Sequence, residues 1–234
     1  MADLNALDLM RIHVDALFTH DAKGRMLRVN EPRGAIAPRI FVGRTVDGYD
    51  LRARADVSVE TLERVRALVM EEPSGAPIAQ RPRCGDAIVA LLASEAPVQR
   101  VWSGPAYSID PDVLPESPKT VRVFSANAEL LNSFPAWRDE VDERQPFLAA
   151  VEDDVAVSLC CSVRITPAAH AAGVETLPTS RRRGMAVQAV SAWAKAVAAL
   201  GATALYSTSW DNLASQAVAR RLGMTLLGVD FHVT

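Results

Sequence analysis

The stretch TSRRRGMAVQAV, residues 179–190, sets three consecutive arginines against a glycine and then continues with almost no charge. Apolar residues recur beyond it at the spacing of one buried helix face: Ala186, Val190, Trp193, Val197 and Leu200. This spacing predicts a largely buried helix over residues 184–200. The preceding AGVETLP predicts a strand that can lie underneath it. The arginines therefore lie at a strand-to-helix junction.

The start of the predicted helix is suited to bind an anion. The first backbone N–H groups of a helix have no partner within it, and the helix dipole favours negative charge there. Gly184 and Ala186 keep side chains small where a phosphate must approach, and the arginines can neutralise its charge. The sequence contains neither the lysine-containing P-loop pattern nor the three-glycine dinucleotide pattern. Nucleoside triphosphates and NAD are therefore poor candidates for the anion.

The bulk composition limits the function classes further. A formal net charge of -3 gives no general field for holding nucleic acid or an anionic membrane. Three aspartates near the start of the chain argue against a secretion signal, and residues 196–210 are too interrupted to span a membrane. Three cysteines without framework spacing favour a reducing cytoplasm. The four histidines are scattered, so we assign no metal site.

A proline-rich segment divides the chain. Three prolines within SIDPDVLPESPKT, residues 108–120, resist both helix and strand pairing, which predicts a linker over 111–119. We therefore expect an α/β region over 1–110 and a second domain over 120–234. In the first region the patterns predict helices over 4–18, from a Ser58 N-cap to Pro73 and over CGDAIVALLASEA, and strands at GRMLRVN and RIFVGRTVDGYDLRARA.

Strands and helices also alternate after the linker, as in an α/β fold. The predicted elements are a strand TVRVFS, a helix 127–138, strands FLAAVED, VAVSLCCSVRI and AGVETL, a helix 184–200, a strand TALYSTS, a helix 212–222 and a strand TLLGVDF. Cys160 and Cys161 lie in an apolar strand, so we expect buried core cysteines. Trp193 is expected in the core, and Trp210 is a candidate for the wall of a substrate pocket.

Two motifs together resemble the GNAT acetyltransferase superfamily. RRRGMA matches its R-x-x-G-x-A loop, with Arg181, Gly184 and Ala186 in the fixed positions. YSTSWDNLASQAVARRLGM, residues 206–224, is similar to the strand and helix that follow. The resemblance implies a mixed, mostly antiparallel central sheet flanked by helices, preceded by the smaller α/β region. That region would form a substrate wall, a dimer contact or a degenerate copy of the fold.

The resemblance also implies acetyl-CoA as cosubstrate, with an acetyl group passing directly to an amine. The implied cofactor-binding residues are Val174, Thr176, Arg181, Arg182, Arg183, Gly184, Met185, Ala186, Asn212 and Ser215. The acceptor would be a small-molecule or peptide amine. A non-catalytic acyl-CoA-binding or regulatory module is the alternative. A nucleic-acid scaffold rests only on the arginine run, and the acidic charge balance disfavours it.

Amine acylation needs a proton acceptor, because an amine with a pKa near 10 is mostly protonated at neutral pH. Glu175 is the first candidate base, because the resemblance implies that its strand lines the cleft and pairs with the pantetheine arm of the cosubstrate. Alternation places Glu175 on one strand face with Gly173 and Leu177. A rim carboxylate paired with an arginine is the other interpretation. His170 is the second candidate. Many superfamily members carry a tyrosine that can protonate the leaving sulfur where this chain has Ala219. Tyr206, Ser207 and Ser209 are the replacement candidates, and a thiolate can also leave unaided.

Overall fold

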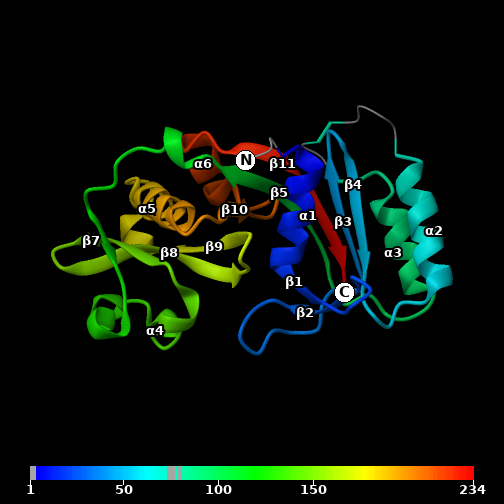
Figure 1. Cartoon of the computed structure of the whole chain (residues 1–234), viewed down its shortest axis with the longest axis horizontal. Helices are drawn as coiled ribbons and strands as arrows, with labels where there is room; N and C mark the ends of the chain where they lie inside the picture. The colour runs from blue at the N-terminus through cyan, green and yellow to red at the C-terminus, as the bar shows by residue number, and fades with distance from the viewer. Residues whose placement is uncertain (1–3, 73–76, 79–80) are drawn as a thin grey trace. The chain divides into compact units, whose positions relative to one another are not determined.

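The computed structural model describes residues 4–72, 77–78 and 81–234. It confirms a mixed α/β architecture in which mostly antiparallel strands are flanked by helices (Figure 1). Contacts divide the chain into two compact units. Unit 1 contains residues 1–107, 207–212 and 226–234, and unit 2 contains residues 108–206 and 213–225.

Unit 1 contains a hairpin, β1 with β2, and a sheet in the order β4-β3-β11-β5. Its strands are β1 (Phe18–His20), β2 (Met26–Val29), β3 (Ile40–Thr45), β4 (Gly48–Ala53), β5 (Val101–Ile109) and β11 (Thr225–Val233). β3 pairs antiparallel with β4 and with β11, and Gly228 lies opposite Thr45. The last strand of the chain is therefore built into the N-terminal unit.

Helices cover both faces of the unit 1 sheet (Figure 1). They are α1 (Ala6–Leu17), α2 (Val59–Met70) and α3 (Gly85–Ala93). Alternation along β3 sends Phe41 toward α1, and Ile40 and Val42 toward α2 and α3. The predicted N-cap of α2 is confirmed, because Ser58 Oγ accepts a hydrogen bond from the Thr61 N–H at 3.0 Å.

Unit 2 has the strand order β10-β9-β8-β7-β6. Its strands are β6 (Thr120–Arg122), β7 (Phe147–Glu152), β8 (Val155–Ile165), β9 (Ala169–Thr176) and β10 (Thr203–Ser207). β9 and β10 are parallel, and the other neighbouring pairs are antiparallel. The register that joins β10 to β9 covers Thr203–Leu205 and ends at Ala171. The C-terminal half of β9 thus continues past its pairing with β10.

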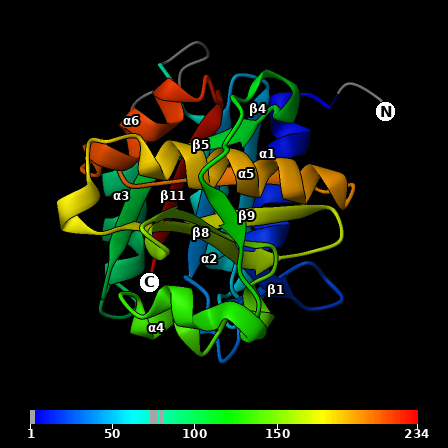
Figure 2. The same ribbon diagram turned by 90° about the vertical axis from the view of Figure 1, so that its left-hand side faces the viewer.

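The helices of unit 2 lie on opposite faces of its strands. They are η1 (Pro111–Val113), η2 (Ser125–Leu131), α4 (Pro135–Arg138), η3 (Asp142–Arg144), η4 (Pro178–Ser180), α5 (Met185–Ala199) and α6 (Leu213–Arg221). α5 runs across β7, β8 and β9 on one face, with Trp193 fully buried as predicted (Figure 2). The segment η2–α4–η3 covers the other face, where Leu131, Phe147 and Leu159 share one core.

Three parts of the structure differ from the sequence-based expectation. The helix expected over 127–138 is two short pieces, because Asn127 leaves helical geometry and Pro135 begins a new helix. β5 was not predicted. The segment expected as a linker packs on α5, since Ser191 Oγ donates to the Pro115 carbonyl at 2.7 Å and Lys195 pairs with Glu116 at 2.7 Å.

Candidate active site

The N-terminal end of α5 forms a turn with open backbone donors, which we call the cradle (residues 181–187). Arg182 and the N-cap Gly184 both have positive φ, +61° and +83°. Gly184 has no side chain with which to cap the helix, and Gln188 is the residue whose N–H bonds back to the Gly184 carbonyl, at 3.2 Å. The N–H groups of the first turn, including those of Met185 and Ala186, therefore remain available to a bound anion.

The three arginines of the cradle are not equivalent. Arg183 makes a two-pronged ion pair with Glu152 of β7, with N–O distances of 2.7 and 2.8 Å. Arg181 and Arg182 are exposed on the turn itself. The Arg183 charge is already matched by a carboxylate, so Arg181 and Arg182 are the stronger candidates for an incoming anion.

The edge of β9 beyond Ala171 is a second feature suited to a ligand. Val174 and Thr176 lie on this half of the strand, and on its other side they pair with Cys160 and Ser158 of β8. Thr176 Oγ1 lies 2.7 Å from Ser158 Oγ. An extended molecule can add to such an edge by strand-like hydrogen bonds to the backbone.

Glu175 lies on the face of β9 that carries α4. It is opposite Leu159, whose side chain belongs to the α4-side core, and the predicted shared face with Gly173 and Leu177 agrees with this placement. The carboxylate is exposed and accepts a hydrogen bond from Trp137 Nε1 to Oε2 at 2.5 Å. Glu175 is thus bound by an indole N–H and not by an arginine, which was the alternative interpretation of this carboxylate.

Trp137 is a site residue that sequence reasoning missed. Its ring packs edge-on to Phe147, with centroids 6.5 Å apart, and the Arg144 guanidinium lies 5.3 Å from its centre. A Cβ at Gly173 would be 3.2 Å from Trp137 Cη2 and 2.2 Å from Val163 Cγ1. The absence of a side chain at Gly173 therefore leaves the space that the Trp137 indole occupies beside Glu175. Local sequence around a short four-residue helix carries no periodic signal for this contact.

Two other predicted residues are brought together. The Tyr206 hydroxyl lies 2.6 Å from Ser215 Oγ, which joins the end of β10 to α6 within unit 2. Ser209 and Asn212 belong to the 207–212 segment of unit 1, where Ser209 Oγ donates to Asp211 and the Asn212 N–H bonds to the Ser209 carbonyl. The predicted residues are thus divided between the two units.

His170, the second candidate base, is buried on the α5 side. Its Nδ1 lies 2.8 Å from Ser162 Oγ, which also accepts a hydrogen bond from Trp193 Nε1 at 3.0 Å. Burial lowers the pKa of His170 below its usual value. Cys160 and Cys161 are fully buried as predicted, and burial raises the pKa of both thiols.

A comparison with known protein families finds a similarity in the C-terminal part of the chain. A sequence model of the FR47-like protein family matches residues 157–232. Residues 157–232 are therefore similar to the FR47-like family. The match includes β9, the cradle, α5 and the Tyr206–Ser215 pair. A search of curated proteins finds no match.

Solved structures show the same fold. A protein from Novosphingobium aromaticivorans described as a GNAT-family acetyltransferase superposes with a TM-score of 0.50 at 17% identity, over 58% of this chain. The aligned part spans 66% of that protein, just under two thirds of its length. A GNAT-family acetyltransferase from Colwellia psychrerythraea superposes with a TM-score of 0.50 at 14% identity, over 79% of this chain and 76% of the other.

The described part of the chain has neither a membrane-spanning helix nor a cluster of metal-ligating side chains. No helix there is long and apolar enough to cross a membrane. Among residues 4–72, 77–78 and 81–234, no three His, Cys, Asp or Glu side chains are grouped so that they could hold a metal ion.

Proposed function

We propose that the protein is an acetyl-CoA-dependent N-acetyltransferase whose cosubstrate binds to unit 2. One observation carries the proposal: an open β9 edge leads directly into a helix N-terminus that has positive-φ geometry and exposed arginines. The pantetheine arm of acetyl-CoA would fit the β9 edge, and the diphosphate that follows it would fit the N-terminal end of α5. The acceptor is a small-molecule or peptide amine.

The cradle residues would hold the diphosphate. The backbone N–H groups of Met185 and Ala186 face the N-terminal end of α5, and Arg181 and Arg182 add positive charge. Residues 172–176 would bind the pantetheine arm through backbone hydrogen bonds. Acetyl-CoA supplies the acetyl group as a thioester when it is bound.

Glu175 would accept the proton that the amine must lose. Trp137 keeps one carboxylate oxygen in place through its N–H, while the other oxygen remains for the amine or an intervening water. The exposure of Glu175 leaves room for an acceptor above this strand face. Trp137 acts as a positioning residue, because its contact is with the base.

The Tyr206–Ser215 pair is the candidate for the proton donor to the leaving sulfur. Tyr206 is 3% exposed, and its hydroxyl is oriented by Ser215 from α6, the helix in which Ala219 replaces the usual tyrosine. A thiolate is a tolerable leaving group near neutral pH, so the donor assists the reaction without being indispensable.

A non-catalytic acyl-CoA-binding module is the second candidate, and Ala219 is the observation that favours it. The two functions differ in turnover. Incubation with acetyl-CoA and a panel of amines should release free CoA from an enzyme and none from a binder.

Glu175→Gln tests the catalytic assignment in the same assay. Loss of the base should lower kcat about 100-fold and leave the acetyl-CoA dissociation constant unchanged. Glu71→Gln, at an exposed position just after α2, is the matched control and should retain full activity. Full activity of Glu175→Gln would remove Glu175 from the mechanism.

A further inference from the structure

A hollow of about 720 Å³ lies within unit 1. It is located where β3 and α2 begin and where β4 and α3 end. Its volume is within the range of roughly 300–1,000 Å³ that is typical of small-molecule sites. The transferase chemistry proposed above uses none of its lining residues.

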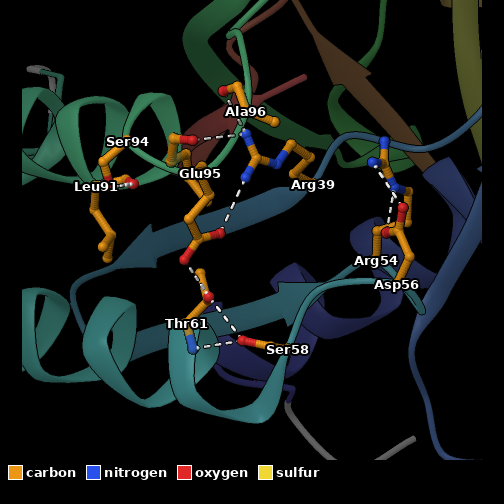
Figure 3. A network of polar contacts seen from close by, with 10 residues as sticks. Arg39, Arg54, Asp56, Ser58, Thr61, Leu91, Ser94, Glu95 and Ala96 are labelled. Carbon is orange, nitrogen blue, oxygen red and sulfur yellow. Dashed lines mark hydrogen bonds and ion pairs between the residues drawn. The ribbon is translucent and has the colours of Figure 1, made fainter.

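The carboxylate of Glu95 lies on the polar side of the hollow, where Arg39 and Thr61 hold it in place (Figure 3). Arg39 Nη1 donates to the carbonyls of Leu92 and Ala96 at 2.9 and 3.2 Å, and Nη2 donates to Glu95 Oε2 at 3.2 Å. The other oxygen of Glu95 accepts the Thr61 hydroxyl at 2.5 Å. The Glu95 side chain is still 35% exposed, so its oxygens can accept further hydrogen bonds from a ligand.

The hydroxyl groups beside Glu95 are oriented as acceptors. Thr61 gives its one hydroxyl hydrogen to the Glu95 carboxylate, which can only accept. Ser58, 2.8 Å away, must therefore donate to Thr61, while its own oxygen accepts the Thr61 N–H. Glu95, Thr61 and Ser58 all present oxygen lone pairs, so a ligand in contact with them has to be a hydrogen-bond donor.

Arg54 supplies donors on the other side. Its Nε and Nη2 bind both oxygens of Asp56 at 2.7 and 3.0 Å, and Nη1 donates to the Ala37 carbonyl at 3.0 Å. Each terminal guanidinium nitrogen carries a second N–H, which can donate to a ligand carbonyl.

Each charged side chain that lines the hollow is paired with one of opposite sign. Arg39 pairs with Glu95 and Arg54 pairs with Asp56. A ligand with a net charge would have to compete with one of these pairs, whereas an uncharged ligand would not.

We propose that the hollow binds a small uncharged carboxamide with an apolar tail. The amide N–H groups would donate to Glu95 and Thr61, and the amide oxygen would accept from Arg54. The tail would cover the apolar wall formed by Ile36, Val57, Ala96 and Pro97. A carboxamide matches the site because it joins donors and an acceptor in one uncharged group.

Three probes with the same tail test the head group. The full chain is titrated by calorimetry with phenylbutyramide, phenylbutyrate and phenylbutylamine. The amide should bind at least about tenfold more tightly than the acid or the amine, because each charged head disturbs an ion pair. The proposal is overturned if either charged probe binds as tightly as the amide, or if the amide shows no saturable binding.

Two exposed substitutions test the location. Ile36→Asp removes part of the apolar wall at a side chain that is 61% exposed, and Val46→Asp makes the same change at a 77% exposed position outside the hollow. Ile36→Asp should weaken phenylbutyramide binding about fivefold, because apolar contact with the tail is lost, while Val46→Asp leaves it unchanged. Equal binding by both variants would show that the amide binds elsewhere. Acetyl-CoA binding is a separate readout, so this outcome leaves the transferase proposal untouched.

Discussion

At the scale of single residues, the hydrogen bond from Trp137 to Glu175 is the contact that fixes the position of the carboxylate. Glu175 was proposed as the base from the resemblance of its strand to that of the GNAT superfamily, and this role stays a prediction. Trp137 was not recognisable, because it lies 38 residues away and reaches Glu175 only through the packing of α4 on β8 and β9. Such a contact depends on tertiary structure that local patterns do not encode.

Trp137→Phe keeps the aromatic ring and removes the N–H donor. Loss of a hydrogen bond to a charged group should lower kcat about tenfold, with the KM for acetyl-CoA unchanged, since the indole contacts the base rather than the cradle. Steady-state kinetics at saturating amine measures kcat and the KM for acetyl-CoA separately. An unchanged kcat would mean that Trp137 only packs beside Glu175.

At the scale of elements, the predictions succeeded where a periodic pattern or a cap was present. α5 and the Ser58-capped α2 agree with their predicted ranges to within a few residues. β5 was missed because Gly104 and Pro105 interrupt it and its burial does not alternate. The predicted helix 127–138 was wrong because its apolar residues belong to two short helical pieces, the second of which begins at Pro135. The open edge of β9 was not predicted either. It exists because the pairing with β10 ends at Ala171, and the sequence alone does not give the register between two strands.

Gly173→Ala tests how closely the Val163 side chain of β8 approaches the backbone of β9. The new methyl group would lie 2.2 Å from Val163 Cγ1, so the variant should lose about 1–3 kcal/mol of unfolding free energy through overpacking. Urea denaturation measures this loss. The double variant Gly173→Ala with Val163→Ala removes the clashing carbon and should be less destabilised than the two single changes predict together. Strict additivity would contradict this packing arrangement.

At the scale of the whole molecule, the two units differ from the division expected at residues 111–119. Residues 108–119 belong to unit 2 because they pack on α5, and residues 226–234 belong to unit 1 because β11 pairs with β3. The pairing of Gly228 with Thr45 joins residues far apart in the chain, and no local signal predicts it. The roles considered for the N-terminal region, as a substrate wall, a dimer contact or a degenerate copy, stay predictions.

The stability of the molecule should fall in mild acid because of His232. Burial beside Trp102 and Phe41 lowers the pKa of His232 to about 4, with Asp230 opposing this shift and Arg100 adding to it. The unfolded chain, with a His pKa of about 6.5, then binds a proton that the folded chain does not, so stability decreases as the pH falls from about 6.5 to about 4.

His232→Phe keeps the ring and removes the titration. The variant should lose about 3 kcal/mol less unfolding free energy than the parent between pH 7 and pH 4. Urea denaturation at a series of pH values measures the difference. Parallel pH profiles for the two proteins would exclude His232 as the source.

In the proposed function the N-terminal end of α5 binds the diphosphate of acetyl-CoA, and a matched pair of glycines tests this binding. Gly184 and Gly201 lie at opposite ends of α5, both have positive φ, and a Cβ added at either position would have no atom within 4 Å beyond its immediate surroundings in the chain. Gly184→Glu and Gly201→Glu therefore impose similar backbone strain, but only the first places a carboxylate at the cradle.

Calorimetric titration with acetyl-CoA, with CoA and ATP as comparison ligands, is the decisive measurement. The parent and Gly201→Glu should bind acetyl-CoA and CoA saturably and in preference to ATP, and Gly184→Glu should bind acetyl-CoA at least about 100-fold more weakly. Absence of acetyl-CoA binding by the parent, or equal binding by Gly184→Glu, would contradict the assignment of the cradle and of the transferase function built on it.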